Sequence, residues 1–76
     1  MRILKRVHNG GTQAVLTQLA DGWHIQVELK KMDRSPVTIG FQQPTLKLAQ
    51  GFADDEVIDF GHVCSRSCKK WVETTF

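Results

Sequence analysis

Long hydrophobic runs are missing from this sequence of 76 residues. No segment approaches the roughly 18 to 20 consecutive apolar residues that a membrane-spanning helix requires. The basic start at residues 1–6 is not followed by the apolar stretch of about 7 to 15 residues that marks a secretory signal. We therefore expect a soluble, cytoplasmic protein that has no membrane partner.

Catalytic signatures are missing as well. The sequence contains no Gly-x-Ser-x-Gly, no phosphate-binding loop and no dinucleotide-binding fingerprint. The acidic run at residues 54–56 lacks the spaced oxygen ligands of a calcium loop, and a solvated helix end explains it better. These absences predict a protein that is not an enzyme.

A strong excess of one charge is also absent. Ten basic and eight acidic side chains give a net charge of +2, which does not by itself imply nucleic-acid binding. The basic residues fall in three clusters, which either converge on a nucleic acid or form separate solvated surfaces. A nucleic-acid-binding surface would use Arg2, Arg6, Lys30, Lys31, Arg34, Lys69 and Lys70.

The clearest pattern that is present is an alternation of apolar and polar residues. Trp23, Ile25, Val27 and Leu29 alternate with polar residues, which predicts a half-buried strand. The preceding Asp-Gly pair predicts a tight hairpin to a partner strand at residues 14–19. A third strand is predicted at 37–41, after a polar loop at 31–36, and residues 1–7 provide a possible fourth strand.

The apolar period changes after Pro44. Apolar residues then recur at three- and four-residue spacing, which predicts a helix over about 45–54, with Pro44 or Thr45 at its start. Gly51 inside this helix suggests close contact with the sheet. We expect a short extended segment at 57–60 and a second helix at 65–73.

Together these patterns predict an α+β fold in a single domain spanning residues 1–76. Its sheet is a three- to four-stranded antiparallel meander, followed by one or two helices packed on one face. A chain this short buries only roughly 60% of its unfolded surface, so a metal, a disulfide or a partner subunit often adds stability.

The two cysteines, Cys64 and Cys68, therefore matter. In a reducing compartment they stay thiols, and in an oxidising one a disulfide becomes possible. If both are helical, their sulfur atoms lie on one face and can share a Zn²⁺ ion with His62 as a third ligand. The alternative is an apolar stripe of Cys64, Cys68, Trp71 and Val72 that packs on the sheet, because free cysteine is often buried.

This segment resembles the C-terminal half of the FCS, YHS and TRASH zinc knuckles. In that family a Cys-Ser-x-x-Cys opens a helix, and an aromatic and an acidic residue follow. The matching positions are Cys64, Ser65, Cys68, Trp71 and Glu73. The resemblance implies one zinc ion. The upstream Cys-x-x-Cys of the family has no counterpart, so other ligands would come from His62, His8, His24 or Asp59.

The sequence thus predicts a small non-enzymatic binding module, with either a zinc-fastened or a simply packed C-terminal helix. One alternative is a nucleic-acid-binding accessory domain. Its architecture is loosely similar to the DNA-binding sheets of phage-type integrases, and it would use the polar strand faces, although Glu28 opposes a phosphate partner. The other alternative is a protein-interaction or inhibitor module without metal. The polar strand residues that the nucleic-acid-binding alternative would use are His24, Gln26, Glu28, Lys30, Thr38 and Gln42.

Overall fold

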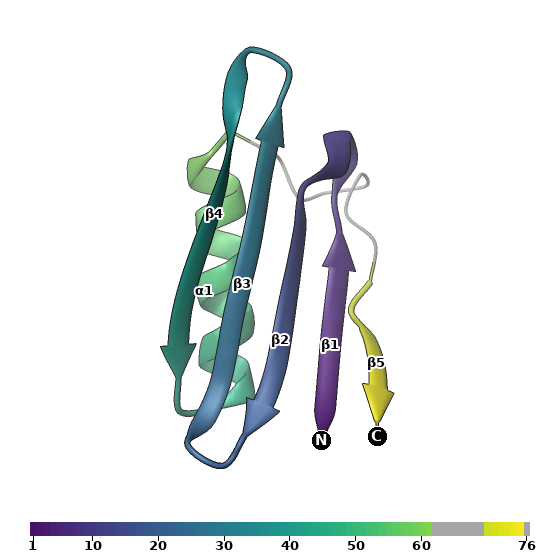
Figure 1. Cartoon of the computed structure of the whole chain (residues 1–76), viewed down its shortest axis with the longest axis vertical. Coiled ribbons are helices and arrows are strands. Elements are labelled where there is room, and N and C mark those ends of the chain that lie inside the picture. Colours follow the sequence, from purple (N-terminus) through teal and green to yellow (C-terminus); the bar gives the residue numbers. More distant parts are fainter. Residues whose placement is uncertain (62–69, 76) are drawn as a thin grey trace.

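The chain forms a five-stranded antiparallel sheet with one helix packed on it (Figure 1). The computed structural model describes residues 1–61 and 70–75. The spatial order of the strands is β4-β3-β2-β1-β5. In chain order the elements are β1 (Arg2–Val7), a 3-10 turn (Asn9–Gly11), β2 (Gln13–Leu19), β3 (Gly22–Lys31), β4 (Arg34–Gln43), α1 (Leu46–Asp59) and β5 (Val72–Thr75).

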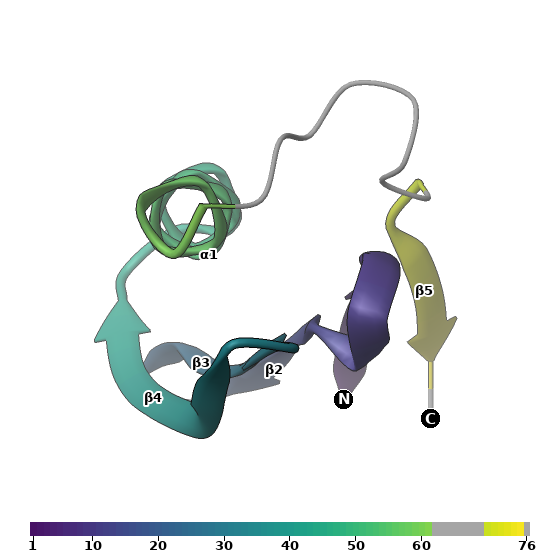
Figure 2. The same ribbon diagram turned by 90° about the horizontal axis from the view of Figure 1, so that it is seen from above.

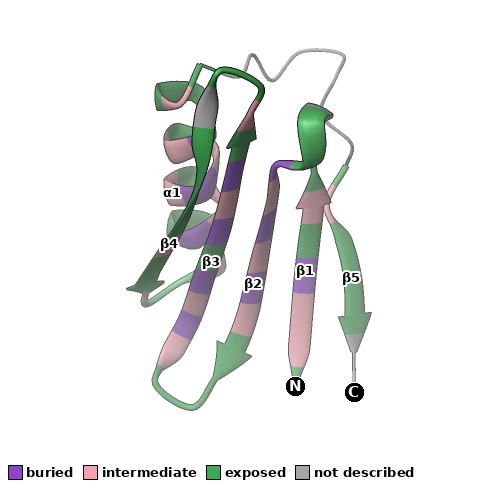
Figure 3. Cartoon of the chain, turned by 45° about the horizontal axis from the view of Figure 1, so that its top comes forward, coloured by how far each residue is buried: buried purple, intermediate pink, exposed green. Residues whose placement is uncertain are grey.

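The predicted three- to four-stranded antiparallel meander is confirmed with four strands, of which β2 and β3 are the inner two. Trp23, Ile25, Val27 and Leu29 are buried between the sheet and α1, as their alternation predicted. Figure 3 shows the buried positions along β2, β3 and the inner side of α1, whereas β4 is mostly exposed. The core therefore lies between one face of β2 and β3 and the helix.

Helix α1 begins at a cap that the sequence predicted. Thr45 is the N-cap residue, and its hydroxyl oxygen accepts a 3.3 Å hydrogen bond from the Leu48 N–H. The buried stripe consists of Ala49, Ala53 and Val57, which are four residues apart. Small alanine side chains let the helix approach the sheet closely.

Two details of the predicted helix were wrong. Residues 57–59 are helical instead of extended, because Val57 continues the buried stripe of Ala49 and Ala53. Gly51 does not contact the sheet: a β-carbon added there would meet nothing within 4 Å. The helix ends at Asp59, and Gly61, two residues later, has a φ of 102° that favours glycine.

The predicted second helix at 65–73 was also wrong in its described part. Val72 and Glu73 belong to β5, which pairs with β1 through the register Leu4↔Glu73. The rest of that prediction, residues 65–69, lies outside the described residues. Residues 72–75 form a strand because they pair with the edge of β1, which is far away in the sequence.

Helix α1 covers the β3–β4 half of the sheet more than the half that contains β1 and β5. Seen from above, α1 lies over the half formed by β3 and β4, and β1 and β5 lie further from it (Figure 2). The described side chains that cover β1 on this side include Trp71, whose ring lies 5.3 Å from the Arg6 guanidinium carbon. No described helix is long and apolar enough to cross a membrane.

Candidate functional site: the open face of the sheet

The face of the sheet turned away from α1 is mainly polar, and we call it the open face. No segment within residues 1–61 and 70–75 packs over it. The register places its side chains by alternation with the buried ones: every second residue of β3, starting at His24, points to this side. On the three neighbouring strands the open face carries Gln13, Val15, Thr17, His24, Gln26, Glu28, Lys30, Thr38, Gly40 and Gln42.

A shallow hollow lies in the middle of the open face, around Gly40. Its volume is about 630 Å³, and its lining includes Thr17, His24, Gln26, Thr38 and Gln42. Gly40 pairs with Gln26 across the strands. A β-carbon on Gly40 would meet nothing within 4 Å, and its φ is not positive. The backbone therefore does not need glycine here, and the missing side chain creates the hollow.

Such a glycine has a recognised meaning in a strand. Glycine weakens a strand interior because it adds backbone entropy and packs nothing, and it often marks a place where a ligand approaches the backbone. The hollow at Gly40 therefore points to a binding surface. Its lining combines amides, hydroxyls and an imidazole, which donate and accept hydrogen bonds, with the apolar residues Val15, Ile25 and Phe41.

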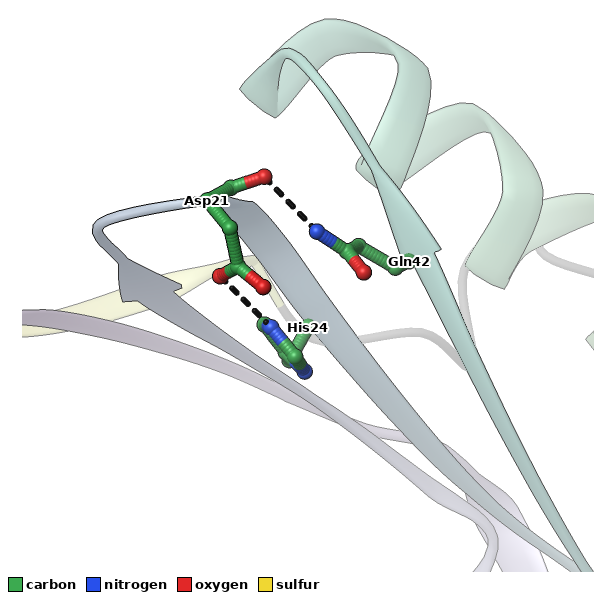
Figure 4. A network of polar contacts seen from close by, with 3 residues as sticks. All are labelled: Asp21, His24 and Gln42. Atoms are coloured by element: carbon green, nitrogen blue, oxygen red, sulfur yellow. Dashed lines mark hydrogen bonds and ion pairs between the residues drawn. The ribbon is translucent and has the colours of Figure 1, made fainter.

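One border of the Gly40 hollow is held by a polar network at the β2–β3 turn (Figure 4). The His24 Nε2 atom lies 3.0 Å from Oδ1 of Asp21. The Gln42 side-chain amide donates a 2.7 Å hydrogen bond to the backbone oxygen of Asp21. The network therefore fixes two side chains that line the hollow, one from β3 and one from β4.

The same network changes the acidity of Asp21. The side-chain hydrogen bond with His24 is the largest cause that lowers the pKa of the Asp21 carboxyl below its ordinary value of 3.8. Hydrogen bonding to the charged form favours that form. Asp21 therefore stays an acceptor for His24 into acidic solution.

The charges on the open face are mixed, with a small basic excess. Glu28 accepts a 2.9 Å hydrogen bond from the Gln13 amide, so part of its acceptor capacity is occupied. Lys30 lies on the same strand face, and Lys5 on β1 faces the same side through its pairing with Val15. The acidic cluster at residues 54–59 belongs to α1, on the opposite side of the sheet.

The structure does not bring together the basic residues that the sequence suggested for nucleic-acid binding. Arg2 and Arg6 lie on the helix side of β1, where Arg2 pairs with Glu73 and Arg6 with Asp54. Lys31 reaches toward Gly61 at the end of α1. Lys30 lies on the open face, Arg34 begins β4, and Lys70 is exposed just before β5. Lys69 lies outside the described residues.

The suggested metal ligands Cys64, Cys68 and His62 lie outside the described residues. Among residues 1–61 and 70–75, no three His, Cys, Asp or Glu side chains are grouped to hold a metal. His8 is buried beside the 3-10 turn, and His24 contacts Asp21. Of the positions that carry the resemblance to zinc knuckles, Trp71 and Glu73 are described, and Glu73 lies in the strand β5.

The fold and the open face define a class: a small α+β module with one helix-covered sheet face and one open polar face. Comparison with protein-family models, with curated proteins and with solved structures finds no match. Sequence alternation had already marked the polar residues of β3. The Gly40 hollow was missed, because it depends on the register that sets Gly40 opposite Gln26.

Proposed function

We propose that this protein is a non-enzymatic binding module that docks the open face of its sheet into a nucleic-acid duplex. The observation that carries the proposal is the Gly40 hollow, a depression at a glycine on β4 that hydrogen-bonding side chains of β2, β3 and β4 border. The major groove of DNA admits a two-stranded β-ribbon. Strands β3 and β4 form such a ribbon, and its open side carries the hollow.

The side chains of the hollow are of types that read base edges. Gln26 is exposed and faces Val15 on β2 but no side chain on β4, where Gly40 is its partner, so its amide can reach over Gly40. A glutamine amide can form two hydrogen bonds with adenine, and threonine and histidine can bond to base edges or phosphates. Lys5 and Lys30 supply positive charge on the same face, which suits a phosphate backbone.

The test is fluorescence anisotropy with labelled mixed-sequence DNA and RNA duplexes, measured over a range of salt concentrations. Binding is expected to weaken as salt rises, because phosphate contacts release counterions. Lys5→Gln is expected to reduce the salt slope by about 1. Salt-independent behaviour, or no binding to either duplex at low salt, would contradict the proposal and favour a protein partner.

The most specific variant is Gly40→Val, which fills the hollow. Valine favours strands, so this variant should fold at least as well as the original protein. We expect the affinity for the duplex to fall about tenfold or more, since a lost base contact is worth roughly 1–3 kcal/mol. Gly51→Ala is the matched control, because it also adds a side chain in open space but on the helix side.

A further inference from the structure

Strand β4 is an edge with little protection. It is ten residues long and pairs with β3 on one side, and no strand among the described residues pairs with its other side. Natural proteins usually protect such edges with charges, prolines or bulges. Arg34 and Pro36 lie at the start of the strand, but between Val37 and Gln43 it has no charged residue and no proline. The opposite edge, β5, is four residues long and contains Glu73.

An apolar surface continues from this edge onto α1. Phe41 of β4 stacks on Phe52 of α1, with ring centroids 4.6 Å apart, yet Phe41 is 52% exposed. Beside them is a second hollow of about 380 Å³, the Gly51 hollow. It is lined by Gln43, Lys47, Leu48, Gly51, Phe52 and Asp55. Leu48 in its lining is 52% exposed, and Gly51 adds no side chain.

The charges at this hollow are self-complementary. Lys47 and Asp55 lie on the same helix face on either side of Gly51, about 12 Å apart along the helix axis. A twofold axis reverses the direction of α1 and so sets Lys47 of one copy against Asp55 of the other, twice. Contacts across a twofold axis must have this reciprocal form. Gly51 lies midway between the two charges and is next to Phe52 in the sequence. The charges and the stacked rings of Phe41 and Phe52 therefore indicate the same position for the twofold axis.

We propose that the β4 edge is a self-association surface, at which a second copy of this chain adds its own β4 in antiparallel pairing. The axis passes beside Phe41 and Phe52. Four aromatic rings then meet at the centre, and two reciprocal Lys47–Asp55 ion pairs flank them. The β4 backbone groups that face away from β3 gain hydrogen-bond partners, and the exposed Leu48 side chains are buried. This dimer does not depend on nucleic-acid binding.

Sedimentation velocity over a range of concentrations tests the proposal. The unmodified protein is expected to be dimeric at concentrations on the order of 100 µM, where even weak self-association is detected. Leu48→Glu should raise the dimer dissociation constant tenfold or more, since it sets a carboxylate against the acidic half of the other helix. It should keep the fold, because glutamate three residues after the Thr45 cap suits a helix start.

Val72→Glu is the matched control. Val72 is 64% exposed on β5, at the opposite edge of the sheet, so this variant should dimerise normally. Lys47→Glu should weaken the dimer, and Lys47→Glu combined with Asp55→Lys should restore it. Circular dichroism checks that each variant is folded. A monomer at the highest concentration, equal effects of the Leu48 and Val72 variants, or no rescue by the charge swap would overturn the proposal.

Discussion

Gly22 lies where β2 turns into β3, with a φ of 130°. A β-carbon built there would lie 2.9 Å from the backbone oxygen of Gln43. Gly22→Ala therefore combines backbone strain with a clash against main-chain atoms. We expect it to lower the free energy of unfolding by about 1–3 kcal/mol, measured by urea denaturation.

Gly51→Ala serves as the comparison for that variant. Gly51 has a helical backbone and open space around it, so alanine should raise the free energy of unfolding by up to about 1 kcal/mol. The two substitutions add the same methyl group, so opposite signs isolate the effect of backbone conformation. Equal effects on stability would show that the β2–β3 turn relaxes to accept a side chain.

The Asp21–His24 contact predicts a pH dependence. Since the fold lowers the pKa of Asp21, the pair stabilises the protein at pH values above the ordinary carboxyl value of 3.8. That contribution is lost as the pH falls through the lowered pKa. An NMR titration should find the Asp21 midpoint below 3.8 and see it rise in His24→Phe.

Stability measurements provide the second half of this test. The original protein should lose more stability than Asp21→Asn as the solution is acidified through the range below 3.8. Asp33→Asn, which removes a carboxylate from the β3–β4 turn, controls for the change in net charge. An Asp21 midpoint that does not move in His24→Phe would show that the hydrogen bond is not the cause.

At the scale of the elements, the Arg6 side chain of β1 contacts both α1 and the residue before β5. Arg6 lies 2.7 Å from Asp54 of α1, and its guanidinium carbon lies 5.3 Å from the ring centroid of Trp71. The two side chains of the ion pair are only 21% and 33% exposed, so water screens them less than a surface pair. This arginine therefore connects strand, helix and the start of β5.

We expect Arg6→Leu to lower the free energy of unfolding by about 1–2 kcal/mol, because it removes the ion pair and the cation–π contact together. Arg2→Leu is the matched control on the same strand face, where the pair with Glu73 is more exposed, and its effect should be smaller. A double-mutant cycle of Arg6→Leu with Asp54→Ala should give a coupling of about 0.5–1.5 kcal/mol. Additive effects of the two substitutions on the free energy of unfolding would contradict the proposed role of Arg6 in connecting these elements.

Local patterns predicted the elements whose partners are close in the sequence. The alternation from Trp23 to Leu29 identified β3 and its buried side, and the polar residues of the open face followed from it. The same reasoning failed at Trp71 and Val72, because their spacing from the cysteines suits a helix as well. What decides their structure is pairing with β1, and a single sequence does not display such a distant contact.

At the scale of the whole molecule, a chain of 76 residues has a small core, and chains of this size often need a further stabilising element. The sequence left two alternatives open for its C-terminal segment: zinc at His62, Cys64 and Cys68, or a packed segment without metal. Since Val72 and Glu73 are in β5 and not in a knuckle helix, we expect protein purified without a histidine tag to contain no stoichiometric zinc. Its melting temperature should be unchanged by a chelator and by Cys64→Ser. One zinc per chain, lost together with folding in that variant, would establish the knuckle instead.

The pairing of β5 with β1 has a consequence for synthesis on the ribosome. Strands β1 to β4 and α1 emerge first and can collapse on one another, but one side of β1 stays bare until residues 72–75 have left the exit tunnel. During that interval the sheet edge opposite β4 is the six-residue β1 instead of the four-residue β5, which contains Glu73. The slower the chain is synthesised, the longer the uncovered edge of β1 is exposed to aggregation and to chaperone binding.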